Sequence, residues 1–182
     1  MNIRDIILVA IAQDGNKIRG RTLLQKRLYF VDVLLNINLG YRPYYYGPYS
    51  PAVDDALGDL KGLRFVEERQ SSFGASDESG FEVRRYDYEL TEDGKTIVNH
   101  LKKNSEYNRI ILALDRLKAA HEPDYFTLSI AAKAHFILSD KGVPMTREEI
   151  IEVAKKLNWK ITESQFNNAA DFLHRLGLIE DA

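Results

Sequence analysis

Five cations lie close together near the start of the chain, and no acid occurs between Gly15 and Val31. This basic run consists of Lys17, Arg19, Arg21, Lys26 and Arg27. Its first three members precede a predicted helix, whose N-terminal N–H groups and dipole favour an anion such as a DNA phosphate. We therefore predict phosphate contacts from the basic run. The alternative is a solvated face on which some of these side chains pair with acids.

The next predicted helix, over 51–62, carries the opposite charge. Asp54, Asp55 and Asp59 stand there against Lys61 alone. A winged helix normally lays this helix in the major groove, where bases are read mostly by Arg, Lys, Asn or Gln. Three carboxylates would repel the phosphates, so either the acids point elsewhere or this unit binds a protein.

Two further places offer candidate contacts to DNA. Arg84 and Arg85 lie on a presumed wing, where a backbone or minor-groove contact and a structural role are both open. Near the C-terminus, the last predicted helix and the residues just before it offer Lys160, Gln165 and Asn168. These side chains suit DNA better than the acidic helix does.

Tyrosines cluster between the second and third predicted helices. Tyr44, Tyr45, Tyr46 and Tyr49 could form the binding surface for a protein partner or a stacking surface for bases. The alternative is that they pack one helix on the other. The sequence Gly47-Pro48-Tyr49-Ser50-Pro51 restricts the backbone strongly and favours that structural role.

The residues needed for catalysis are poorly represented. The chain has no cysteine, which excludes thiolate chemistry and disulfides. Its four histidines share no spacing typical of a metal site, and the sequence has no phosphate-binding loop and no Gly-x-Ser-x-Gly motif. We predict no enzyme activity, no metal and no cofactor.

The composition is that of an ordinary soluble protein. The 182 residues are 45% hydrophobic and carry a formal net charge of −2, so bulk charge does not attract nucleic acid. The N-terminus lacks the pattern of a signal peptide, and no apolar run approaches the ~20 residues of a membrane span. We expect a cytoplasmic protein without membrane contact.

The hydrophobic spacing orders the first half of the chain as helices followed by a hairpin. We predict helices over 2–13, from a Thr22 cap to Gly40, and over 51–62 with Ser50 as cap. Strands follow over 65–70 and 81–90, with a loop over 71–80. A long helix then starts at Thr91 and reaches about Ala120, with a possible break near Asn104.

The second half reads as three more helices on short connectors. They are predicted over 125–138, 146–157 and 162–176, with Thr146 and Thr162 as caps. His121–Asp124 is the best candidate for a domain boundary. Both halves show helices running into a Gly-Leu step, at Gly62-Leu63 and Gly177-Leu178.

A family resemblance covers roughly residues 1–100. The stretch Gly20-Arg21-Thr22-Leu23-Leu24-Gln25-Lys26-Arg27-Leu28-Tyr29-Phe30, followed by Tyr46-Gly47-Pro48-Tyr49-Ser50, resembles the pattern of YwgA-like proteins and, more loosely, of the Panacea domain. The resemblance implies a winged helix. It also implies that toxin–antitoxin or proteolysis-adaptor roles are relevant, because such roles are associated with Panacea relatives.

Together these observations predict a mostly helical α+β fold. We expect a winged helix-turn-helix over 1–92, a linking helix over 93–122, and a C-terminal helix-turn-helix-like unit over 123–182. The leading hypothesis is a regulator that binds double-stranded DNA as a homodimer joined by the linking helix. The alternative is a protein-interaction module, such as an antitoxin or adaptor, that uses the same scaffold without DNA.

Overall fold

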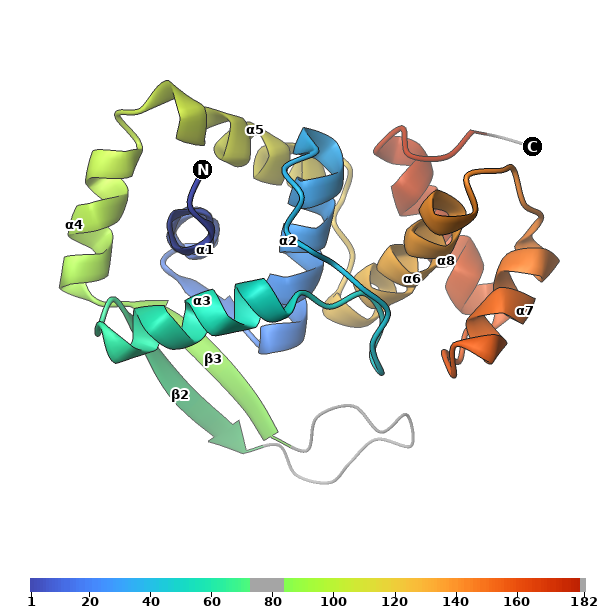
Figure 1. Ribbon diagram of the computed structural model, residues 1–182, viewed down its shortest axis with the longest axis horizontal. Coiled ribbons are helices and arrows are strands. Elements are labelled where there is room, and N and C mark those ends of the chain that lie inside the picture. Colours follow the sequence, from blue (N-terminus) through green and yellow to red (C-terminus); the bar gives the residue numbers. More distant parts are fainter. Residues whose placement is uncertain (73–83, 181–182) are drawn as a thin grey trace.

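The computed structural model describes residues 1–72 and 84–180 (Figure 1). Within these ranges the chain forms eight helices and one three-stranded antiparallel sheet, so the predicted mostly helical α+β class is confirmed at that level. No helix in the same ranges combines the length and apolar composition that crossing a bilayer requires. The loop predicted over 71–80 falls almost wholly outside the described residues.

Helix α1 (Ile3–Gln13) is the centre of the N-terminal half. Figure 1 shows it end-on, enclosed by four other helices. Those helices are α2 (Arg21–Leu35), α3 (Pro51–Gly62), α4 (Glu92–Leu101) and α5 (Ser105–Ala119). The six residues from Ile6 to Ile11 are each at most 2% exposed. A helix covered on all sides needs apolar residues around its whole circumference, and this stretch supplies them.

The sheet contains β1 (Lys17–Arg19), β2 (Val66–Ser72) and β3 (Arg84–Leu90), with β3 in the middle. The sequence pattern does not predict β1, because a three-residue strand with one apolar side chain carries too little alternation. Ile18 of β1 lies opposite Tyr88 of β3, and both are buried. Residues 17–19 precede α2, as predicted, and they also form an edge strand of the sheet.

The caps of α2 and α3 differ in how well they could be predicted. Helix α2 begins at Arg21 with Gly20 as N-cap, so the predicted Thr22 cap is wrong. Gly20 has φ 96°, a conformation that favours glycine. The predicted Ser50 cap of α3 is confirmed, since its hydroxyl accepts a hydrogen bond from the Val53 N–H.

The predicted break in the long helix is also confirmed. Helix α4 ends at Leu101, and the Asn104 side chain caps α5 by accepting from Glu106 N–H. At the other end, Thr91 caps α4. A Cβ at Gly94 would collide with the Phe65 carbonyl oxygen, so the residue facing the end of α3 must be glycine.

Helix α5 uses its apolar face inside the chain. It packs on α1 and α2 through a row of buried side chains: Tyr107, Ile110, Ala113, Leu114 and Leu117. Leu112, 67% exposed, lies outside that row. The homodimer through this linking segment stays a prediction, and the face that would have served it is covered by α1 and α2.

The three predicted C-terminal helices are present as α6 (Tyr125–Lys141), α7 (Arg147–Lys156) and α8 (Glu163–Arg175). Thr146 and Thr162 cap α7 and α8, each with a reciprocal capping box. Every residue from 128 to 135 in α6 is buried, because α2 covers one side of the helix while α7 and α8 cover the other.

The two halves share one hydrophobic core. The rings of Phe30 in α2 and Phe172 in α8 meet edge-on with centroids 5.4 Å apart. The Arg175 side chain of α8 also donates to the carbonyl of Ala120, at the end of α5, at 2.8 Å. The segment 121–124 therefore connects α5 and α6, which both pack against α2.

Candidate functional site

The basic run does not form one surface. Lys17 and Arg19 are exposed on β1. The Lys17 ammonium lies 3.9 Å from a carboxylate oxygen of Asp87, whereas Arg19 makes no ion pair within the described part of the chain. The Arg21 guanidinium lies 3.6 Å from Asp54 of α3. Most of the positive charge at the start of α2 is therefore matched by nearby acids.

Arg27 and Lys26 lie inside the protein. The Arg27 side chain is 12% exposed and contacts Glu122 at 2.6 Å and Asp14 at 2.8 Å. Lys26 is only 2% exposed, and its ammonium donates to the carbonyl of Pro48 at 2.6 Å. Neither cation is placed to reach a duplex backbone, so the phosphate contacts expected from them do not fit this geometry.

Of the two arginines predicted to lie on a wing, Arg85 is paired with an acid. Arg85 holds Asp87 with two hydrogen bonds, from Nε at 2.6 Å and from Nη2 at 3.2 Å. Arg84 is the first residue of β3, and its side chain lies outside the described part of the structure. Asp87 is 4% exposed, which makes this carboxylate the meeting point of Arg85 and Lys17.

Helix α3 presents two of its three acids to solvent. Asp55 and Asp59 are exposed, and Asp59 has one distant ion pair with Arg4 at 3.9 Å. Lys61, the only cation of the helix, donates to Glu68 of β2 at 3.0 Å. The charge on this helix therefore repels a phosphate backbone.

Of the three C-terminal candidates, one takes part in a helix cap and two are exposed. Gln165 takes part in the N-terminal cap of α8: its side-chain oxygen accepts from the Thr162 N–H at 3.0 Å. Lys160 and Asn168 are exposed on the connector before α8 and on α8 itself. Only these two remain open for an external contact.

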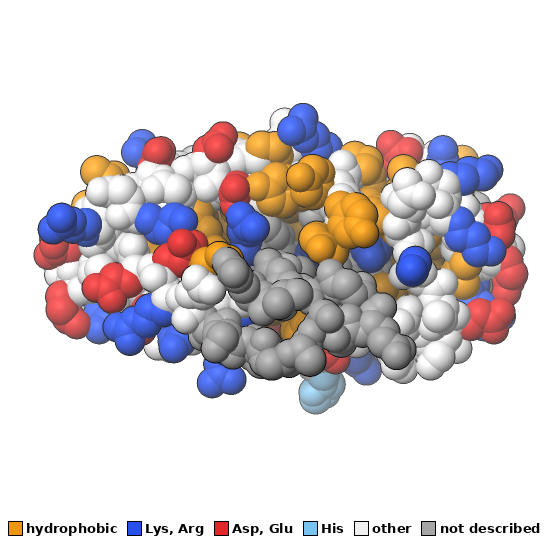
Figure 2. Space-filling view, turned by 90° about the horizontal axis from the view of Figure 1, so that it is seen from below, with side chains coloured by type: hydrophobic (Ala, Val, Ile, Leu, Met, Phe, Trp, Pro, Cys, Tyr) orange, Lys and Arg blue, Asp and Glu red, His pale blue; other side chains and the backbone are white. Residues whose placement is uncertain are grey.

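The four tyrosines lie on one irregular segment, here called the tyrosine loop (residues 41–50). Arg42 and Tyr49 pair across it in both directions, with N···O distances of 3.1 and 2.9 Å. The rings of Tyr44 and Tyr49 stack 5.0 Å apart, and Tyr45 meets Tyr46 edge-on at 4.8 Å. Tyr44 and Tyr45 are 58% and 69% exposed, and hydrophobic side chains gather near the middle of the face in Figure 2.

Side chains from three distant segments hold the carbonyls of the tyrosine loop. Trp159, before α8, donates from its indole to Tyr44 O at 2.7 Å. Ser129 of α6 donates to Tyr46 O at 3.0 Å, and Lys26 of α2 donates to Pro48 O at 2.6 Å. The sequence indicated a restricted backbone here, but it gave no sign that Ser129 and Trp159 supply these contacts.

A pair of hydrogen bonds fixes the end of the tyrosine loop. Gln25 donates to the carbonyl of Ser50 at 3.0 Å and accepts from its N–H at 3.1 Å, and both residues are buried. Tyr41 also donates to Gln25 O at 2.7 Å. The loop is therefore preorganised, and the exposed tyrosine rings stand on a fixed backbone.

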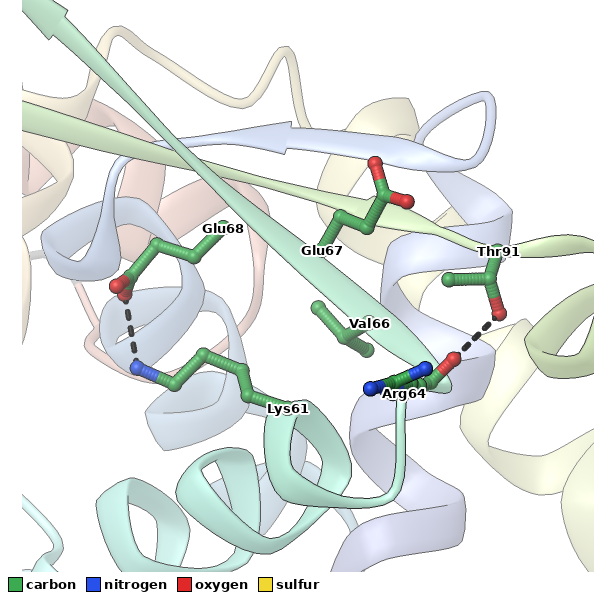
Figure 3. Close-up of a pocket in the computed structure, with 6 residues that line it drawn as sticks. All are labelled: Lys61, Arg64, Val66, Glu67, Glu68 and Thr91. Atoms are coloured by element: carbon green, nitrogen blue, oxygen red, sulfur yellow. Dashed lines mark hydrogen bonds and ion pairs between the residues drawn. The ribbon is translucent and has the colours of Figure 1, made fainter.

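A surface hollow of about 510 Å³ lies between the end of α3 and β2 and is lined by Lys61, Arg64, Val66, Glu67, Glu68 and Thr91 (Figure 3). It is shallow, and its charged side chains are of mixed sign, with Lys61 already bonded to Glu68. No group of three potential metal ligands occurs within residues 1–72 and 84–180.

A comparison with models of protein families and with curated proteins found no match for this chain.

Proposed function

We propose that this protein is a protein-interaction module built on a winged-helix scaffold, with the tyrosine loop as its binding surface. The scaffold is supported by the order of elements over residues 3–90, which is helix, strand, helix, helix, strand, strand. It is also supported by the placement of β3 between β1 and β2. This order agrees with the fold that the Panacea-like motifs imply.

The exposure of Tyr44 and Tyr45 on a fixed backbone carries the proposal. Tyrosine is enriched among residues that dominate protein interfaces, because it buries a large area at a small entropic cost. Here the cost is lower still, since the carbonyl of Tyr44 is already bonded to Trp159 and the loop is bridged by Arg42 and Tyr49. A partner that offers an apolar cleft would bury both rings.

The charges support a protein partner over a nucleic acid. The cations Lys17 and Arg21 are paired with acids, and the outer face of α3 carries the exposed carboxylates of Asp55 and Asp59. A surface of this kind does not concentrate phosphates. It is compatible with an antitoxin or adaptor that presents an aromatic patch.

The test is a quantitative pull-down from cells of the source organism, followed by binding measurements with the purified partner. The double variant Tyr44→Ala/Tyr45→Ala should weaken binding by at least about 30-fold, the effect of a ~2 kcal/mol hot spot. Leu112→Ala, which truncates a similarly exposed apolar side chain on α5, is the matched control and should bind like the wild type. Equal binding by all three folded proteins would exclude the tyrosine loop as the surface.

DNA binding is the second candidate, and the exposed cations Arg19 and Lys160 favour it. A mobility-shift titration on duplexes from the gene's own neighbourhood tests it over a range of salt concentrations. Replacing both cations by Glu should reduce the slope of log affinity against log salt by about two. A slope that does not change between the variant and the wild type would contradict direct phosphate contacts from these residues.

A further inference from the structure

Two lysines lie buried beneath the tyrosine loop. Lys26 of α2 is 2% exposed and Lys133 of α6 is 5% exposed. Neither forms an ion pair with a carboxylate in the described part of the chain. Buried lysines are normally paired, so two of them together without an acid call for an explanation.

Gly47 marks the place where the two lysine side chains come together. A Cβ at Gly47 would lie 3.0 Å from Cγ and 3.3 Å from Cε of Lys133, and 3.5 Å from the Nζ of Lys26. Both lysines therefore run under the same glycine, whose φ of 106° already disfavours any other residue. The loop therefore lies over the aliphatic stem of Lys133 and the ammonium of Lys26.

The two ammonium groups differ in what they bind. Lys26 donates to Pro48 O, whereas Lys133 makes no hydrogen bond within the described residues. No fully buried side-chain nitrogen in those residues lacks a partner, so the Lys133 ammonium keeps contact with solvent. This ammonium has three N–H donors available and lies at the edge of the tyrosine loop.

The electrostatics favour an anion at this edge. Burial lowers the pKa of Lys26 to about 7, with the charge of Lys133 as a second cause, and burial lowers the pKa of Lys133 to about 8. Two like charges in a poorly solvated place raise each other's energy, and a bound anion would reverse that effect. The Lys133 stem is packed against Gly47 and the Lys26 ammonium is bonded to Pro48 O, so an anion would meet the solvent side of the Lys133 ammonium.

We propose that Lys26 and Lys133 form a binding site for one small oxyanion, a phosphate or a carboxylate, held directly by the Lys133 ammonium at the edge of the tyrosine loop. Lys26 contributes its charge from behind while it remains bonded to Pro48. The site is distinct from the exposed tyrosine rings, and its occupation does not depend on a protein partner.

The test measures the melting temperature of the purified chain in sodium phosphate and, separately, in sodium acetate, each against sodium chloride at the same ionic strength. Binding should raise the melting temperature by about 2–4 °C when the anion reaches about five times its dissociation constant. A rise in phosphate alone would assign the site to phosphate, and a rise in both salts would assign it to oxyanions including carboxylates. No rise in either salt beyond chloride would overturn the proposal.

Two variants at position 133 and one control locate the effect. Lys133→Met should remove the rise, and Lys133→Arg, which keeps the charge, should retain most of it. Lys160→Met removes an exposed lysine and should behave as the wild type. If Lys133→Met kept the full rise, the anion would bind elsewhere and the proposal would fail. Because no partner is present, this result is independent of whether the tyrosine loop binds a protein.

Discussion

Two neighbouring regions treat their cations in opposite ways. Around β1 and α2, each of four cations lies within 4 Å of a carboxylate: Lys17, Arg21, Arg27 and Arg85. For Arg85 the carboxylate belongs to the same strand, and for the other three it belongs to another part of the chain. Beneath the tyrosine loop, by contrast, Lys26 and Lys133 are buried without an acid. Three of the five cations of the basic run are therefore paired with acids, whereas its buried member Lys26 is paired with none and lies near Lys133, more than a hundred residues away in sequence.

This difference between paired and unpaired cations determines where a bound anion can gain free energy. An anion that approaches the paired cations must compete with Asp87, Asp54 or Asp14, and the surface pairs have little energy to offer. An anion that approaches Lys133 meets a cation without a competing acid.

The largest effect is expected from Arg27→Met. This change leaves the Glu122 and Asp14 carboxylates without their cation, and the Glu122 side chain is only 9% exposed. We expect the free energy of unfolding to fall by about 3 kcal/mol, or the melting temperature by about 6–12 °C. Lys17→Met, the control at a 43% exposed side chain with a 3.9 Å pair, should cost less than about 1 kcal/mol. Similar losses in both variants would show that burial does not separate the two kinds of pair.

The next effect concerns pH. Lys26 and Lys133 have pKa values of about 7 and about 8 in the folded chain, below the ordinary value of 10.5 that the unfolded chain retains. Between these values the unfolded chain binds more protons, so the free energy of unfolding should rise with pH. The cost of the two buried charges is present in full below about pH 6 and is relieved as pH rises from 7 to 9. Denaturant titrations should show a gain of about 1–3 kcal/mol over that range.

The shifted pKa values of His135, Tyr49 and Tyr107 act outside this window. Burial lowers the pKa of His135 to about 4, so its contribution to the pH dependence ends near pH 6.5. Burial raises the pKa of Tyr49 and Tyr107 to about 12, so their ordinary ionisation in the unfolded chain destabilises the fold only above about pH 10. The rise from pH 7 to 9 should shrink in Lys133→Met. If the free energy of unfolding of the wild type did not change between pH 7 and 9, the two lysines would not be buried in their charged form.

The smallest effect is expected at Trp159. Trp159→Phe keeps most of the buried ring but removes the indole N–H that binds Tyr44 O. The loss should be about 1–2 kcal/mol, since one carbonyl loses its partner. Partner binding should fall with it if the tyrosine loop is the interface, because the loop would lose part of its preorganisation. Phe136→Leu, which alters the ring packed 6.1 Å from Trp159 without touching that hydrogen bond, is the control.

Much of the fold could be predicted from the sequence, because its signals are local. The Ser50-Pro51 and Thr146 caps and the break at Asn104 each depend on residues a few positions apart. Strand β1 could not be found, because Ile18 alone carries its pattern and its partner β3 is far along the chain. The prediction of Thr22 as the cap is wrong because Gly20, which has a positive φ, is the single residue between the end of β1 and the start of α2.

The site was harder to predict, because its pairings are long-range. Asp87 and Glu122 lie far from the basic run in sequence, and no local pattern links them to Lys17 or Arg27. Lys26 did carry a signal: it stands three and four residues before Tyr29 and Phe30, on a face of α2 that is buried. The position of Lys26 on an apolar face of α2, which α6 covers, predicts its burial better than its charge does.

The hydrogen bonds that hold the tyrosine loop also determine how the molecule unfolds. Trp159 and Ser129 belong to the C-terminal half, and Lys26 and Gln25 belong to α2, so opening the loop breaks contacts in both halves at once. Backbone amides in α2 and α8 should therefore exchange their hydrogens with deuterium at a common opening free energy. The tyrosine loop thus also links the N-terminal and C-terminal halves, so that the two halves unfold as a single cooperative unit.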